Sequence, residues 1–311
     1  QKGSGWHLAP ISLFCIAIKF FSLIHSKYCL IIVSVEEKGL INLEYLSILE
    51  LNGKGSFELL QGQITSDMQK VTQDNCVLGS ICDLKGRVVS SFVIAVSSEK
   101  EHAYYLIGNK EVLETTKIIL EKYKPFYEST IEENNKYQFY AIQEEDLKDK
   151  FAKTNLDNTF QDYGHFFRLH YLNKKFHLIA SKEADYFKDY KISNNENLWK
   201  LDEINNQNYE ISSETVSRFT PHELGYHLTE RVDFEKGCYT GQEIVARMHY
   251  RAKKLPKIVI KSTKKQIEDL EKVQDKKNNS LGIILSCAVK ENQKYALLSM
   301  NKNYIDQELD L

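Results

Sequence analysis

The sequence predicts an α+β fold, and three observations carry this prediction. Strand-like and helix-like segments follow one another in mixed order, without the regular alternation of a βαβ series. The chain has 311 residues, 42% of them hydrophobic, which is enough for a substantial core and for two or three domains. The last part of the chain contains short strand-like segments, which favour a small β-barrel at the C-terminus.

The N-terminal stretch differs in composition from the rest. Residues 11–35 are apolar, but Lys19 and Lys27 divide them into pieces too short for a transmembrane helix. No small-residue cleavage site follows them. No methionine precedes Met68, so the first residues either follow a removed initiator or derive from upstream sequence. We therefore expect residues 1–43 to be a leader outside the core.

The next segment, residues 44–143, predicts a first α+β domain. Apolar residues recur with nearly helical spacing in 110–126, and Pro125 ends that pattern. Alternation and β-branched residues predict the strands, and Gly86 marks a tight turn. The expected elements are strands at 45–53, 103–109 and 136–143, a short helix in 56–67 that breaks up around Gly62 and Thr65, a helix in 110–126, and a hairpin at 80–98 that turns at Lys85–Gly86.

The rest of the chain divides into three further segments. Residues 144–198 form a second α+β segment, in which 144–162 is a polar connection or short helix and 166–181 a hairpin turning at Asn173. Residues 199–255 return toward the first domain. The expected C-terminal β-barrel spans 256–311, with strands at 257–263, 280–289 and 294–302.

Charge and cysteine content limit the function classes. The formal net charge of −2 predicts no global attraction to nucleic acid or to a membrane. The six cysteines contain no CxxC pair, no Cys/His cluster with metal-ligand spacing and no disulfide framework. We therefore expect a reducing, cytoplasmic setting and no tightly bound metal.

The segment KGCYTGQE, residues 236–243, holds the candidate reactive group. Thr240, Glu243 and the following apolar run match a capping box, which predicts that a helix begins there. Cys238 would then lie near the positive end of a helix dipole, with Lys236 close in sequence, and both effects favour the thiolate. The alternative is that Cys238 is a small residue packed in a turn.

This segment resembles the signature of the YgfZ family, the folate-binding proteins of tRNA modification and iron–sulfur maintenance within the glycine cleavage T-protein superfamily. LLQGQITSD at 59–67, CDLKGRV at 82–88 and NSLGIILSCA at 279–288 are also similar to family segments. The resemblance spans residues 44 to about 303. It implies a three-domain fold like that of the glycine cleavage T-protein, with a central opening that holds a folate.

The resemblance also implies roles for single residues. Cys238 falls on the family's functional cysteine, and Trp199 falls on a tryptophan that lines the folate site. The family's second folate-site aromatic corresponds to Leu46, with Tyr45 beside it. The remaining matched positions are Lys236, Tyr239, Gln242 and Glu243 around the thiol, and Gln61, Gly62, Thr65, Asp67, Gly86 and Arg87 in the first domain or at the rim of the opening.

Each of these side chains also has a structural interpretation. A flat pterin needs an aromatic platform, but Trp199 is equally suited to packing in a core. Arg87 could bind a carboxylate by two hydrogen bonds or be an ordinary surface charge. Asp67 could meet the donor edge of a pterin or cap the following helix, and we favour the cap.

A basic stretch follows the signature. No acidic residue occurs between Glu243 and Glu268. The stretch is typical of a solvated face, but it could also bind an anion, such as the glutamate tail of folate or RNA phosphates, with His249 and Tyr250 interleaved. The basic residues are Arg247, Arg251, Lys253, Lys254, Lys257, Lys261, Lys264 and Lys265.

Two functions remain open at this stage. The first is a folate-binding accessory protein whose Cys238 thiol supports iron–sulfur cluster assembly or repair and thereby tRNA thiolation, with assembly proteins or tRNA-thiolating enzymes as partners. The second is a tetrahydrofolate-dependent aminomethyltransferase of the T-protein type. Direct tRNA binding through residues 247–265 is a weaker third reading. One cysteine cannot hold a cluster alone, so Cys238 would be a shared cluster ligand at most.

Overall fold

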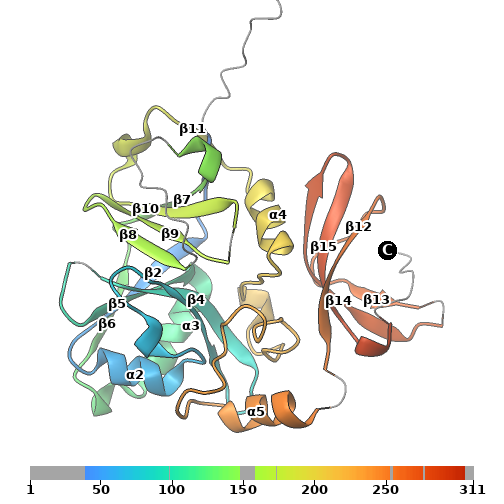
Figure 1. Ribbon diagram of the computed structural model, residues 1–311, viewed down its shortest axis with the longest axis horizontal. Coiled ribbons are helices and arrows are strands. Elements are labelled where there is room, and N and C mark those ends of the chain that lie inside the picture. Colours follow the sequence, from blue (N-terminus) through green and yellow to red (C-terminus); the bar gives the residue numbers. More distant parts are fainter. Residues whose placement is uncertain are drawn as a thin grey trace, which may run out of the picture. The chain divides into compact units, whose positions relative to one another are not determined.

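The computed structural model describes residues 39–97, 99–147, 158–172, 174–252, 255–275 and 277–304. These residues form three β-sheets with few helices, which confirms the α+β class (Figure 1). The expected leader lies outside the described residues except at its end. Gly39–Asn42 forms β1, which pairs with β7 and β11, so the leader boundary at residue 43 is corrected to an earlier position.

The first domain is built on a five-stranded sheet in the order β3-β4-β5-β2-β6. Alternate side chains along these strands point to opposite faces. One face packs against α2 and α3, where Leu51 and Phe92 meet Leu60 and Leu113 (Figure 1). The strands are β2 (Leu46–Asn52), β3 (Val77–Cys82), β4 (Val88–Val96), β5 (Ala103–Asn109) and β6 (Thr130–Asn134), and the helices are α2 (Ser56–Gln63) and α3 (Lys110–Glu121).

The other face of this sheet packs against a six-stranded sheet in the order β11-β1-β7-β10-β9-β8. Tyr105 and Ile107 from β5 share one apolar cluster with Phe139, Phe167 and Leu178 from the second sheet. The second sheet combines the expected second segment with β1 and β7 from earlier in the chain. Its strands are β7 (Gln138–Gln143), β8 (Thr159–Asp162), β9 (Phe166–His170), β10 (Phe176–Ser181), β11 (Lys191–Ser193) and β1.

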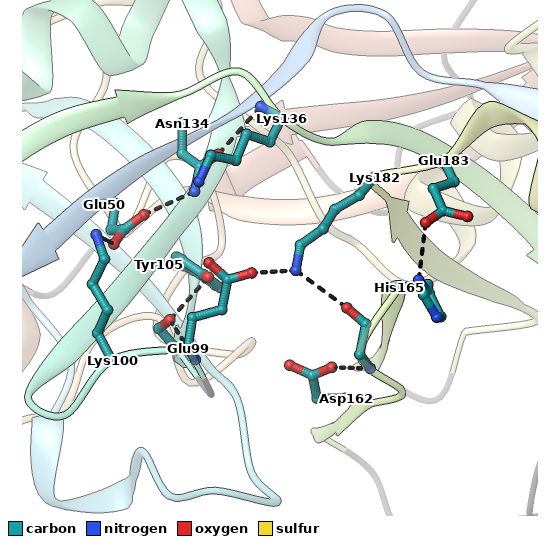
Figure 2. A network of polar contacts seen from close by, with 12 residues as sticks. Glu50, Glu99, Lys100, Tyr105, Asn134, Lys136, Asp162, His165, Lys182 and Glu183 are labelled. Carbon is teal, nitrogen blue, oxygen red and sulfur yellow. Dashed lines mark hydrogen bonds and ion pairs between the residues drawn. The ribbon is translucent and has the colours of Figure 1, made fainter.

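A polar network lies where the β4–β5 connection meets the second sheet (Figure 2). Lys182 forms an ion pair with Glu99 and donates to the Gly164 carbonyl at 3.2 Å. Lys100 in turn pairs with Glu50 on β2 at 2.7 Å. Of the two ion pairs, only Lys182–Glu99 joins the two sheets. Both pairs are partly exposed, so they contribute little to stability.

The C-terminal part is an antiparallel four-stranded sheet in the order β12-β15-β14-β13. The expected closed β-barrel is wrong, because β12 and β13 are the two edges and do not pair with each other. A closed barrel needs every strand to have two neighbours, and β12 and β13 each have one. The strands are β12 (Lys257–Thr263), β13 (Lys272–Gln274), β14 (Ser280–Lys290) and β15 (Gln293–Met300).

The sequence predicted most of these elements. The helix expected to break up around Gly62 and Thr65 ends at Gln63, as predicted. The helix that Pro125 was expected to end stops slightly earlier, at Glu121, and is followed by a 3₁₀ turn at Lys124–Phe126. Two further helices are α4 (Asn197–Asn205) and α5 (Gln242–Arg251). The hairpin at 166–181 is confirmed as β9 and β10, although Asn173 lies outside the described residues.

Candidate functional site

The candidate ligand site is a cavity of about 310 Å³ beside α4. This α4 cavity is walled by that helix, by the segment that follows it and by the β13–β14 end of the C-terminal sheet. Its volume lies at the lower end of the range for small-molecule sites. The lining residues that matter for its chemistry are Tyr45, Trp199, Glu203, Glu210, Asp269 and Leu285.

Trp199 is held firmly in the wall of the α4 cavity. It is 2% exposed, and its ring packs edge-on against Phe176 at 6.3 Å between centroids. Its indole N–H donates to the Tyr45 hydroxyl at 3.0 Å. Burial and the charges of nearby glutamates raise the pKa of Tyr45, so the phenol stays protonated at neutral pH. Tyr45 and Trp199, two residues that the resemblance placed at a folate site, are therefore in direct contact.

A buried lysine lies behind this wall. The Lys174 ammonium is 4.0 Å from the centroid of Tyr171 and 4.2 Å from that of Trp199, and it forms an ion pair with Glu203. The Lys174 side chain is completely buried in this arrangement. A cation between two aromatic faces and a carboxylate is well compensated for its loss of water.

The Glu203 carboxylate continues into a hydrogen-bonded chain. Asn208 donates to Glu203, and Arg231 donates through Nη2 to Asn208 Oδ1 at 3.0 Å. Arg231 is fully buried and also donates to the carbonyls of Gly79 and Phe92, at 3.2 and 3.0 Å. The network thus fixes the floor of the α4 cavity to β3 and β4.

Glu210 is a lining acid that lies outside this network. No hydrogen bond joins its carboxyl to another described residue, in contrast to Glu203. Burial, followed by the charge of Glu203, raises the pKa of Glu210 to about 7. A carboxyl with such a pKa can bind a donor as a carboxylate or exchange a proton near neutral pH.

The signature segment forms a separate site against α2. Lys236 is buried and donates from Nζ to the carbonyls of Gln61 and Ile64, both at 2.7 Å. Burial lowers the pKa of Lys236 to about 8. Thr240 donates to Gln63 Oε1 at 3.0 Å. Two side chains of the loop thus bind the last turn of α2.

Two glycines let the same loop approach the β3–β4 turn. Gly241 has a φ of 82°, and a Cβ there would lie 2.4 Å from the Asp83 carbonyl oxygen. Gly86 has a φ of 71°, and a Cβ there would lie 2.9 Å from Ile244. Both positions favour glycine because their φ is positive and because a Cβ would meet the Asp83 backbone at Gly241 and the Ile244 side chain at Gly86. The segments CDLKGRV and KGCYTGQE, which the resemblance matched separately, therefore pack together.

The capping box predicted at Thr240 is wrong. The N-cap of α5 is Gly241, which makes no side-chain capping bond, and the Thr240 hydroxyl is instead bonded to Gln63. A bond across the fold has taken the side chain that the local pattern assigned to the helix. Cys238 is exposed in the loop before α5, and Gly237 beside it has open space around its Cα. Tyr239 is buried and covers the Lys236 ammonium at 5.3 Å.

The other predicted site residues are distributed between several places. Asp67 caps a 3₁₀ turn by accepting from the Gln69 amide at 3.0 Å, which confirms the favoured interpretation, and it also accepts from Gln61 at 3.0 Å. Arg87 donates to the Arg218 carbonyl. Residues that do not line the α4 cavity are Leu46, Gln61, Asp67, Arg87, Lys236, Cys238, Tyr239, Gln242 and Glu243.

Sequence reasoning missed Lys174, Glu203, Glu210 and Arg231. For Glu203 a signal existed, because it lies four residues after Trp199 and so on the same face of a helix. Lys174 and Glu210 lie outside the matched motifs, and only the fold brings them to this wall.

Two further searches concern only the residues that the structure describes. Among them, no helix is long and apolar enough to cross a membrane. Within the same part of the chain, no group of three or more His, Cys, Asp or Glu side chains is arranged to hold a metal ion.

Comparison with known proteins places these observations in context. No protein-family model matches the chain. It is 28% identical over 236 residues to the tRNA-modifying protein YgfZ of Colwellia psychrerythraea, covering 71% of each chain. It is 26% identical over 226 residues to that of Serratia proteamaculans, covering 68% of this chain and 67% of the relative.

A solved structure has the same fold. The glycine cleavage system aminomethyltransferase T of Bartonella henselae superposes with a TM-score of 0.67 at 12% identity, covering 86% of this chain and 79% of that one. The expected T-protein-like fold is thereby confirmed, apart from the open C-terminal sheet. The chain is therefore similar in sequence to the tRNA-modifying YgfZ proteins and shares the fold of an aminomethyltransferase T.

Proposed function

We propose that this chain is a folate-binding accessory protein that supports iron–sulfur cluster assembly or repair, and thereby tRNA thiolation, through the Cys238 thiol in a cytoplasmic setting. The single observation that carries the folate part is the α4 cavity, in which the contacting pair Tyr45 and Trp199 lies with the unpaired carboxyl of Glu210. The relatives named tRNA-modifying proteins support the cellular role.

The chemistry of the lining suits a pterin. A pterin offers a flat face to aromatic side chains and a row of N–H donors along one edge. Glu210 would accept from that edge, and Tyr45 with Trp199 would flank the ring. Glu203 and Asp269 are paired with Lys174 and Lys200, but Glu196 and Glu214 also line the cavity. Its net charge therefore disfavours the carboxylate tail of folate, which would extend into solvent.

A folate titration tests this assignment. Tetrahydrofolate should bind the full chain under anaerobic conditions with calorimetrically measurable affinity. Trp199→Phe should weaken binding by about threefold, because the smaller ring loses part of an aromatic contact worth about 0.5–1.5 kcal/mol and lacks the N–H that donates to Tyr45. Trp6 would dominate any tryptophan signal of that variant, so calorimetry is preferred to fluorescence. Unchanged folate affinity in both Trp199→Phe and Glu210→Gln would show that folate does not bind in this cavity.

The exposed thiol supports the second part of the proposal. Lys236, Thr240 and Gly241 anchor the loop on both sides of Cys238, so the thiol is presented on a fixed backbone at the surface. One cysteine supplies one of the about four ligands that a cluster needs, so the cluster would be cargo shared with a client protein. Figure 1 shows the loop before α5, where this thiol lies.

Complementation of a deletion strain tests the thiol. Cys238→Ser should fold with wild-type stability and fail to restore the iron content of the tRNA-thiolating enzyme purified from that strain. Cys287→Ser is the matched control, because that cysteine is half-buried in β14 and should be dispensable. Full activity of Cys238→Ser would return this cysteine to a structural role.

A second candidate function is tetrahydrofolate-dependent aminomethyl transfer. The observation that favours it is Glu210, a cavity acid whose pKa of about 7 suits proton transfer to a folate nitrogen. Asp67, the acid expected from the matched segment, is a turn cap away from the cavity. Turnover with a glycine-cleavage carrier protein that is lost in Glu210→Gln, but kept in Cys238→Ser, would establish this alternative.

A further inference from the structure

Two rings of α5 and one ring of the segment before it form an aromatic platform. The rings of Phe234 and His249 are stacked, with centroids 3.7 Å apart and planes at 20°. Tyr250 meets His249 edge-on at 4.9 Å and is 65% exposed. We call Phe234, His249 and Tyr250 the α5 platform. None of the three residues lines the α4 cavity.

Buried histidines support the platform from behind. His222 is fully buried, and its Nε2 lies 3.5 Å from His249 Nδ1, while its ring is 4.9 Å from that of His227. Burial, followed by the charges of His227 and His249, lowers the pKa of His222 to about 4, so this support is neutral at pH 7. The inner side of the platform therefore rests on a packed, uncharged ring, while Tyr250 stays open to a ligand.

Cations lie on the same face of the helix as the exposed ring. Arg247, Tyr250 and Arg251 are spaced i, i+3 and i+4, which places them side by side. Both arginines are exposed, and neither forms an ion pair with a described residue. Glu243 is the acid on this face, one turn nearer the helix start. The face thus combines an exposed aromatic ring with two uncompensated guanidinium groups.

We propose that the α5 platform binds single-stranded RNA, with unpaired bases stacked on Tyr250 and phosphates bound by Arg247 and Arg251. The inference rests on the proposed role in tRNA modification and names a direct ligand for it. Exposed rings beside arginines favour nucleic acid over an acidic protein, because bases offer flat faces where carboxylates do not. Unpaired bases are required, since the bases of an RNA duplex are not free to stack on a side chain.

Fluorescence anisotropy with the full chain and a short labelled oligouridylate tests the proposal. Tyr250→Ala should weaken binding at least about fivefold, the effect of losing one base stack. Phe126→Ala is the matched control, because Phe126 is an 80% exposed ring outside α5, and it should change nothing. The double variant Arg247→Gln, Arg251→Gln should reduce the slope of log affinity against log salt by about 0.7 per lost phosphate contact.

An abasic oligonucleotide of equal length separates stacking from charge. The wild type should bind it several-fold more weakly than oligouridylate, and Tyr250→Ala should bind both equally. Equal wild-type affinity for the two ligands, equal affinity for an RNA duplex, or an unaffected Tyr250→Ala protein would each overturn the proposal. Folate titration and Cys238 complementation are separate measurements, so a failure here is distinguishable from a failure of the proposed function.

Discussion

The wall of the α4 cavity and the signature loop each bury a lysine, but the two sites compensate its charge differently. Lys174 pairs with Glu203 and lies between two aromatic rings. Among the described residues, the hydrogen-bond acceptors of Lys236 are two backbone carbonyls, and burial lowers its pKa to about 8. The ion pair with a carboxylate requires a protonated, charged lysine. The hydrogen bonds to carbonyls require only N–H donors, which a neutral amine also supplies.

Removing the cation from the cavity wall should have the largest effect. Lys174→Met leaves Glu203 buried without its cation, so the free energy of unfolding should fall by about 3–5 kcal/mol in urea denaturation. Lys182→Met, which breaks the partly exposed pair with Glu99, is the control and should cost less than about 1 kcal/mol. Equal losses of unfolding free energy in the two variants would show that burial of the Lys174–Glu203 pair does not increase the cost of breaking it.

Removing the lysine of the signature loop should cost less. Lys236→Met leaves the carbonyls of Gln61 and Ile64 without a donor, so unfolding free energy should fall by about 1–3 kcal/mol. The lowered pKa means that the unfolded chain binds more protons than the folded chain between about pH 8 and 10.5. The stability difference between wild type and variant should therefore grow with pH in that window. A stability difference that does not change between about pH 8 and 10.5 would contradict the lowered pKa of Lys236.

The acid of the α4 cavity gives a pH effect of intermediate size. A bound pterin edge stabilises the Glu210 carboxylate, whose pKa is about 7 in the free protein, so wild-type folate affinity should rise about tenfold from pH 6 to pH 8. Glu210→Gln should bind weakly at both values. Without folate the sign reverses: the raised pKa makes wild-type stability fall between about pH 4.5 and 7 relative to Glu210→Gln. If wild type and Glu210→Gln showed the same pH dependence, Glu210 would not be the group that titrates.

The smallest expected effect lies at the edge of the signature loop. Asp67→Ala removes the acceptor for the Gln69 amide and should lower unfolding free energy by about 1 kcal/mol, measured by thermal denaturation. Asp67→Asn keeps an acceptor and should cost less than the alanine variant. If Asp67→Ala lowered the unfolding free energy as much as Lys174→Met, Asp67 would have a structural role beyond capping the 3₁₀ turn.

The sequence by itself determined the local elements and the signature. Alternation and helical spacing located β2, β4, β5 and α3, and the segment KGCYTGQE located the exposed thiol, because these features depend on neighbours within one or two turns of chain. The resemblance also brought Tyr45 and Trp199 to one site.

Only the tertiary structure decided how those pieces are completed. Thr240 bonds to Gln63 instead of capping α5, the C-terminal sheet stays open because β12 and β13 do not pair, and Lys174 reaches Glu203 across the fold. Glu210 acquires its raised pKa from burial and from Glu203, neither of which a linear pattern displays. The physical reason is that burial and charge pairing are properties of residues distant in sequence, and they can outweigh the about 1 kcal/mol that a local cap provides.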